Sequence, residues 1–234
     1  MDEDGAIEAR LAAVRARRGY LLAHHGLLAI TSQRMLEAYD AAYTELALNP
    51  RVLSPHDREF VWLCILIATD EALATHHIAK FLGAGGSDAE VATAIRLTAW
   101  AQGACAYAFV QRHWRAHLPG LDVAGAYADG LLHNAGAVAP RLAIQAVASV
   151  HAARGDRWPL EQAIVLAYLH RTPEPELAEA ISLMMFPGSV PRFVEAAGVW
   201  LQLIRTGRVS PSPPFAAWAR LEGQGGFDEA AGRR

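Results

Sequence analysis

The chain has 234 residues, of which 53% are hydrophobic and 19% charged, and its formal net charge is −3 at pH 7. The scattered basic residues argue against a nucleic-acid surface or a lipid-binding cluster, and no run approaches the roughly 18 apolar residues of a membrane span. The acidic start, MDEDGAIEAR, is unlike a signal peptide. We therefore expect a cytoplasmic protein whose partner is a small-molecule substrate, with no nucleic acid and no membrane.

Helical patterns recur along the chain and alternating strand patterns are absent, which predicts an all-α protein. The first two helices are expected at about 8–24 and 32–48. A third begins at Ser54 and Pro55, because serine is a good helix cap and proline suits the first helical position.

The next helix is expected over about 70–82, and its glycine-rich end leads into another helix. Ser87 and Glu90 have the spacing of a capping box at the start of that helix. A further helix follows Gly103, and the segment 118–122 then breaks the chain. Later helices are expected to begin near Pro140, Pro159, Pro173 and Pro191.

Two segments of the chain resemble each other without a gap, Glu90 to Trp114 and Glu176 to Trp200, at a spacing of 86 residues. This favours an internal duplication. Upstream, the segment after Ser54 pairs with the segment around Pro159 at a spacing of 104, so the second copy is expected to lack 18 residues, essentially the His77 helix. The expected domains are a first repeat at 1–120, a degenerate second repeat at 121–210 and a tail at 211–234.

The helix expected over 70–82 carries two adjacent histidines. On a helical wheel, Asp70, His77 and Phe81 share one narrow face, which predicts that His77 points inward, whereas His76 points away toward solvent or a subunit contact. An inward histidine can also be a core residue that is hydrogen-bonded to a carbonyl group. The two cysteines, Cys64 and Cys105, are each expected to be small buried hydrophobes.

The spacing of Arg58-Glu59, His77, Gly85 and the Ser87/Glu90 cap resembles the carboxymuconolactone decarboxylase family, which is related to alkylhydroperoxidase D-like proteins. The resemblance covers roughly 53–103, and it reaches the second half only through the repeat. It implies a tandem, all-helical, cofactor-free scaffold that forms homo-oligomers, with its pocket near the histidine helix.

The peroxidase branch of that family carries a Cys-x-x-Cys pair before the histidine, where this chain has Asp70 and Leu73. A thiol peroxidase is therefore excluded at this site. The decarboxylase branch instead implies a lyase or isomerase that transfers a proton on a small carboxylated lactone or oxo-acid, with His77 as the acid or base.

Supporting roles around His77 follow from the same resemblance. Arg58 would bind a substrate carboxylate, and Glu59 and Asp70 would orient the imidazole. We expect Phe81 and Trp100 to contact the substrate. Arg58-Glu59 can equally be a solvated pair at a helix start.

Two alternatives remain. A metal-dependent enzyme could use His24-His25, His76-His77, Asp70 and Glu71, although adjacent helical residues diverge by about 100° and no familiar metal motif is present, so no metal site is predicted. A non-catalytic scaffold could bury His77 and bind a ligand or a partner subunit. Lys80 is expected to be a solvated side chain.

Overall fold

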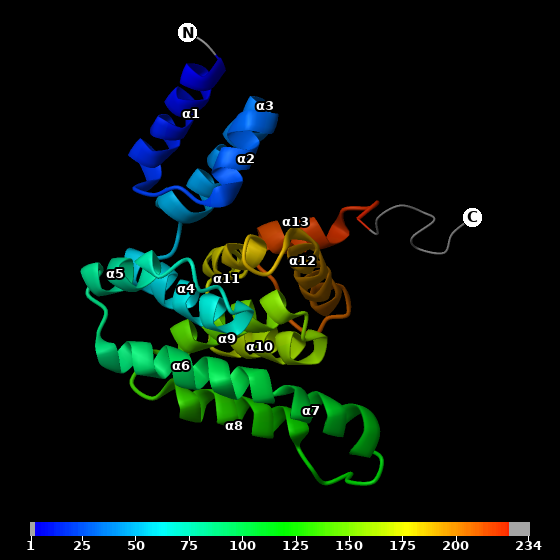
Figure 1. The fold of residues 1–234 in the computed structure, drawn as a ribbon. Helices are drawn as coiled ribbons and strands as arrows, with labels where there is room; N and C mark the ends of the chain where they lie inside the picture. Colours follow the sequence, from blue (N-terminus) through cyan, green and yellow to red (C-terminus); the bar gives the residue numbers. More distant parts are fainter. Residues whose placement is uncertain (1–2, 225–234) are drawn as a thin grey trace. The chain divides into compact units, whose positions relative to one another are not determined.

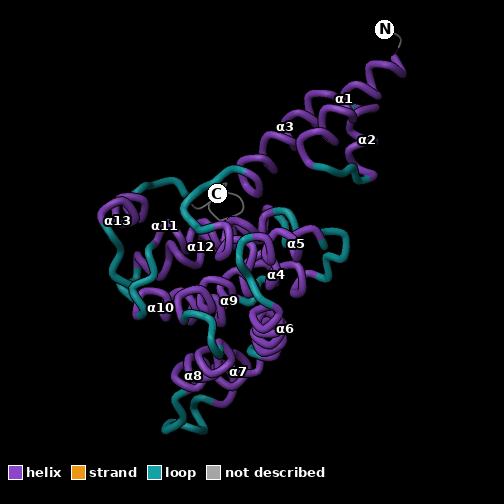
Figure 2. The backbone as a smooth tube through the Cα atoms, turned by 90° about the vertical axis from the view of Figure 1, so that its left-hand side faces the viewer, coloured by secondary structure: helices purple, strands orange, loops and turns teal. Residues whose placement is uncertain are grey.

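The computed structural model describes residues 3–224, which form helices joined by loops, with no strand among them (Figures 1 and 2). The predicted all-α class is confirmed. The chain divides into two compact units, 1–50 and 51–234. No helix among the described residues is both long and apolar enough to cross a membrane.

The first unit is a small group of helices. Its elements are α1 (Glu3–Arg18), α2 (Ala23–Thr31), α3 (Gln33–Tyr43) and a π-helical turn (Thr44–Leu48). Val14, Ala29 and Leu36 form its core, one from each α-helix. The helix predicted over 8–24 is too long, because the chain takes a positive φ of 81° at Gly19, which ends the helical path.

The second unit begins with α4 (Pro55–Thr69), α5 (His76–Gly83) and α6 (Asp88–Gly103). Helix α4 packs against α5 and α6, and its middle is buried throughout. The predicted caps are confirmed: the Ser54 hydroxyl accepts the N–H of Asp57, and Ser87 and Glu90 form a capping box. Next come α7 (Cys105–Phe109), a π-helical turn (Val110–Trp114) and α8 (Val123–Ala135), the last of which was not predicted.

The chain then continues through helices that start near the expected prolines. They are α9 (Pro140–Arg154), α10 (Arg157–Leu169), α11 (Glu174–Ser182), a 3-10 turn (Leu183–Met185) and α12 (Val190–Arg205). A last helix, α13 (Pro213–Arg220), lies in the segment 211–234 that was predicted to be a C-terminal tail. Its first two residues are prolines, which cannot continue a preceding helix but are compatible with the first turn of a new one.

Helices α4 and α9 correspond closely. Each has 15 residues, begins with a proline and ends at a residue with a positive φ, Asp70 or Gly155, and the two helices pack against each other. Pro55 and Pro140 are 85 residues apart, close to the spacing of 86 in the downstream segments. Helix α10 therefore follows α9 as α5 follows α4. At the predicted upstream spacing of 104, α4 would instead pair with α10, so the two spacings assign different helices as equivalent.

Burial in the two similar segments is only partly equivalent. Ala94 and Ala180 are fully buried, but Ile95 is 51% exposed whereas Ile181 is 3% exposed. Ile95 borders a groove on α4, α5 and α6, whereas Ile181 lines a cavity to which α13 contributes side chains. The expectation of equivalent buried faces therefore fails for this isoleucine pair, because the neighbouring elements differ.

Candidate active site

A buried carboxylate and a buried imidazole meet between α4 and α5. The Glu59 Oε2 atom lies 2.6 Å from His77 Nδ1, and the side chains are 2% and 1% exposed. A carboxylate can only accept, so His77 Nδ1–H is the donor. This bond selects one tautomer of the neutral ring, in which Nε2 carries the lone pair and can take up a proton.

Helix α5 is held in place at its far end by Phe81. The Phe81 side chain is fully buried against Phe60 and His56, with ring centroids 6.0 Å and 5.1 Å apart. A Cβ atom at Gly86 would overlap the Phe81 ring, so only glycine fits there. This packing positions His77 one helical turn earlier. It also leaves Phe81 without surface for the substrate contact that was expected of it.

Two cationic side chains accompany the pair. Arg58 Nε lies 3.5 Å from Glu59 Oε1, and the Arg58 side chain is 12% exposed. The pKa of Lys80 is lowered, mainly by burial; the charge of Glu59 opposes this shift and that of Arg58 adds to it. Lys80 was expected to be solvated, but it is half-buried and interacts electrostatically with Glu59 and Arg58. Its position one turn after His77 was the available signal.

Two rings contact the His77 imidazole. The Trp62 indole is stacked on it, with centroids 4.5 Å apart, and the His76 ring is 4.4 Å away. The expectation that His76 points away was therefore wrong. The pKa of His76 is lowered to about 4, first by burial and then by the nearby charges of His77 and Lys80. Trp62 was not predicted, although it lies one turn after Glu59 on α4.

Asp70 does not share a helix with His77. It is the exposed residue that follows α4, with φ 55°, and α5 begins only at His76 after a loop. The helical wheel that placed Asp70 beside His77 assumed one continuous helix and was wrong. Asp70 instead lines the open groove that includes Ile78 and Ile95.

Trp100 belongs to another cluster of side chains. Its ring lies 5.1 Å from that of Tyr127 and 6.5 Å from that of Tyr107, measured between centroids. These contacts join α6 to α8 and α7. The expected substrate contact of Trp100 at the His77 site thus has no support from its observed neighbours.

The histidine pair of the first unit forms its own polar cluster. Both ring nitrogens of His25 face N–H donors, since Arg18 Nη1 lies 2.9 Å from Nε2 and the Leu22 backbone N lies 2.9 Å from Nδ1. Burial lowers the pKa of His25 to about 4. Among the described residues, no group of three or more His, Cys, Asp or Glu side chains is placed to hold a metal ion.

The two cysteines differ in environment. Cys64 is buried, and burial raises its pKa to about 12. Cys105 is exposed, so its predicted burial was wrong: it is the first residue of the short helix α7, which has no buried residue.

The chain matches no protein-family model, no curated protein and no solved structure. Fold and site together define an all-helical protein with a buried imidazole–carboxylate pair, accompanied by an arginine and a lysine. Such a pair can hold a proton at one ring nitrogen and exchange one at the other.

Proposed function

We propose that residues 51–234 form a cofactor-independent lyase or isomerase similar to carboxymuconolactone decarboxylase, in which His77 transfers a proton on a small carboxylated lactone or oxo-acid. The observation that supports it most is the 2.6 Å contact between His77 Nδ1 and Glu59 Oε2. Glu59 fixes the ring by its contact with Nδ1, so that Nε2 is the atom that exchanges protons with the substrate.

The cations suit a carboxylated substrate. Arg58 and Lys80 can bind a carboxylate group and offset its charge while Glu59 remains paired with His77. In a decarboxylation, the bond to the carboxylate carbon breaks, carbon dioxide leaves and the electron pair forms a dienolate. The His77 imidazolium then delivers its proton to carbon and regains one from solvent. In an isomerisation, the same ring removes a proton from one carbon and returns it to another.

The paired helices are consistent with a tandem scaffold in which one half carries the chemistry. At the spacing of 85 residues that separates Pro55 from Pro140, Glu59 corresponds to Ile144 and His77 to Gln162. Ile144 is fully buried and Gln162 is 7% exposed. The second set therefore has no imidazole–carboxylate pair at these positions. The homo-oligomer stays a prediction of the resemblance, and the cytoplasmic location stays a prediction from the sequence pattern.

A non-catalytic scaffold is the second candidate, and the 1% exposure of the His77 side chain favours it. In that case the Glu59–His77 pair only joins α4 to α5. As a catalyst, His77 requires that a neighbouring side chain move to expose its ring, and the half-buried His76 ring lies 4.4 Å from it.

The test is a screen of unsaturated lactones and 2-oxo-acids in deuterated water, with carbon dioxide release and carbon-bound deuterium as readouts. His77→Gln should lower the rate about 10²- to 10⁴-fold while the chain remains folded, because the general acid/base is lost. Glu59→Gln should lower it less. The control is His133→Gln, at an exposed position on α8, which should retain the parent rate.

Two results would decide against the enzyme. One is turnover by His77→Gln at the parent rate. The other is the absence of any exchange or release with the whole panel, together with loss of folding in His77→Gln, which supports the scaffold.

A further inference from the structure

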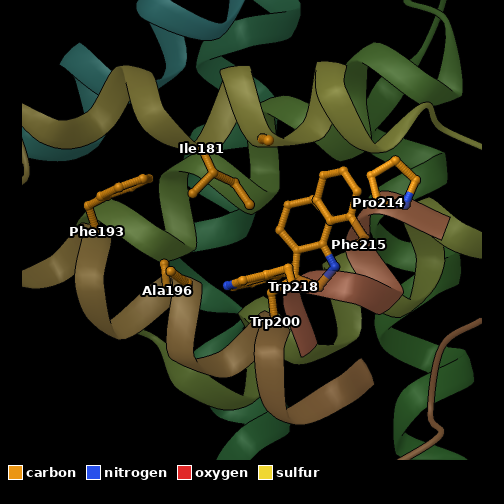
Figure 3. Close-up of a pocket in the computed structure, with 9 residues that line it drawn as sticks. Ile181, Phe193, Ala196, Trp200, Pro214, Phe215 and Trp218 are labelled. Atoms are coloured by element: carbon orange, nitrogen blue, oxygen red, sulfur yellow. The ribbon is translucent and has the colours of Figure 1, made fainter. Parts of the chain in front are cut away.

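A cavity whose lining includes neither Glu59 nor His77 lies among α11, α12 and α13 and has a volume of about 340 Å³ (Figure 3). This volume falls within the range of small-molecule pockets. All the residues that line it are apolar: Ala178, Ile181, Phe193, Ala196, Ala197, Trp200, Pro214, Phe215 and Trp218. Its floor is deep, because Ile181, Ala196 and Trp200 are at most 4% exposed.

The N–H groups of the two indoles already donate hydrogen bonds within the protein. Trp200 Nε1 donates to the Tyr168 hydroxyl at 3.0 Å, and Trp218 Nε1 donates to Gln224 Oε1 at 2.7 Å. The cavity therefore presents ring faces, ring edges and aliphatic groups to a ligand. A charged or strongly polar molecule would lose its hydration there and gain no hydrogen bond in return.

The aromatic side chains have a defined geometry. Trp200 and Phe215 are stacked with centroids 5.1 Å apart and planes 28° apart, and the Trp218 ring is nearly perpendicular to both. Figure 3 shows these rings at one end of the cavity, with Phe193 at the other end and Ile181 between them. A face and a perpendicular edge are the two surfaces that a planar aromatic ring packs against best.

Helix α13, which carries two of these rings, is fixed at both ends. At its start, the Ser212 backbone N–H donates to the Glu174 carboxylate at 3.1 Å, and the Tyr168 hydroxyl donates to the same carboxylate at 2.5 Å. At its end, Arg205 Nε and Nη2 donate to the carbonyls of Ala219 and Leu221 at 2.9 and 2.8 Å. The cavity is thus formed before a ligand arrives, which reduces the entropy cost of binding.

The open groove on α4, α5 and α6 provides a contrast. It has a similar volume, about 390 Å³, but Asp70 and Glu71 contribute to its wall. Acidic side chains favour water there. The two surfaces are therefore chemically different.

We propose that the cavity under α13 is a binding site for a small, uncharged, planar aromatic molecule. Aromatic stacking on Trp200, Phe215 and Trp218 supplies the recognition, and the aliphatic side of the cavity accepts a hydrocarbon substituent. The site requires no residue of the Glu59–His77 pair, so it stands or falls independently of the proposed catalysis.

The test is a fluorescence titration of the full chain with N-phenyl-1-naphthylamine, an uncharged aromatic probe. We expect saturable binding of one probe per chain and quenching of tryptophan emission. Ala178→Phe and Ala197→Phe place a ring in the cavity and should each weaken binding at least about tenfold. The matched control is Ala92→Phe on α6, because Ala92 is exposed and lies 86 positions before Ala178. It should bind as the parent does.

The proposal is overturned by probe binding that does not saturate, by equal affinity in the parent and both cavity-filling variants, or by tighter binding of the anionic 8-anilinonaphthalene-1-sulfonate. Should the filled variants unfold, nuclear Overhauser contacts in the parent protein decide instead. Contacts between the probe and the Ile181 methyl groups support the site, and their absence at probe saturation refutes it.

Discussion

The Trp62 indole is stacked on the His77 ring, with centroids 4.5 Å apart and planes 24° apart. Both side chains are buried, and they come from different helices, α4 and α5. The indole thereby restricts rotation of the imidazole, whose Nδ1 is already bonded to Glu59. Orientation of His77 thus rests on two contacts made by a single face of α4.

Trp62→Ala should lower the free energy of unfolding by about 3–5 kcal/mol, the usual loss for truncating a buried aromatic side chain. Trp62→Phe should lose less, since a ring remains against His77 and since the Trp62 Nε1 atom has no hydrogen-bond partner among the described residues. Urea unfolding measures both. A larger loss for phenylalanine than for alanine would contradict the stacking argument.

Acid should destabilise the second unit in part through His76. Its pKa is about 4 in the folded chain, below its ordinary value of 6.5, so between these values the unfolded chain binds more protons. The free energy of unfolding should therefore fall as the pH drops from about 6.5 to about 4. All six tryptophans lie beyond residue 50, so their fluorescence reports this unit alone. His76→Gln should show a shallower fall; an identical pH profile would contradict the assignment.

Two glycines in one turn should respond oppositely to alanine. Gly86→Ala would place a methyl group against the buried Phe81 ring and should lower stability by about 1–3 kcal/mol. Gly83 ends α5, and a Cβ atom added there would meet no other atom within 4 Å, so Gly83→Ala should be neutral or gain up to about 1 kcal/mol. Thermal unfolding of the two variants side by side checks this, and equal losses would refute it.

The thiols should react at very different rates. Cys105 is exposed, whereas Cys64 is buried with a pKa raised to about 12, and the thiolate is the reactive form. Native protein treated with a thiol-specific disulfide reagent at pH 8 should show rapid modification of one cysteine and modification of the second only after unfolding. Cys105→Ser should abolish the rapid phase. Rapid modification of both thiols in the native chain would contradict the buried position of Cys64.

Local signals in the sequence predicted much of the fold. Ser54 and Ser87 cap the helices that they were expected to cap, because a cap depends only on residues within one turn. Prediction from local signals fails where a helix ends without a strong sequence signal. Asp70 takes a positive φ and ends α4, so the helix that was predicted to start at Asp70 begins only at His76. A helical face that extends across that break could not be correct.

Part of the candidate site could also be predicted from the sequence. That Glu59 orients His77 was expected from a sequence resemblance alone, and the observed contact joins two separate helices, α4 and α5. Trp62 and Lys80 lie near the Glu59–His77 pair because α5 packs on α4. The pattern of residues along one helix does not predict such contacts between two helices. Likewise, the prolines before α13 predicted only an interruption, and its cavity depends on contacts with α11 and α12.

Helices α4 and α9 have the same length, but they should differ in which substitutions they tolerate. Glu59 makes α4 dependent on a buried charge that must keep its partners, and removing one partner of such a pair commonly costs about 3–5 kcal/mol. The corresponding Ile144 of α9 makes no such demand, because its burial needs only shape and apolar neighbours. Position 144 should therefore accept other aliphatic residues of similar size. Substitutions of Glu59 should be tolerated only together with a change at His77.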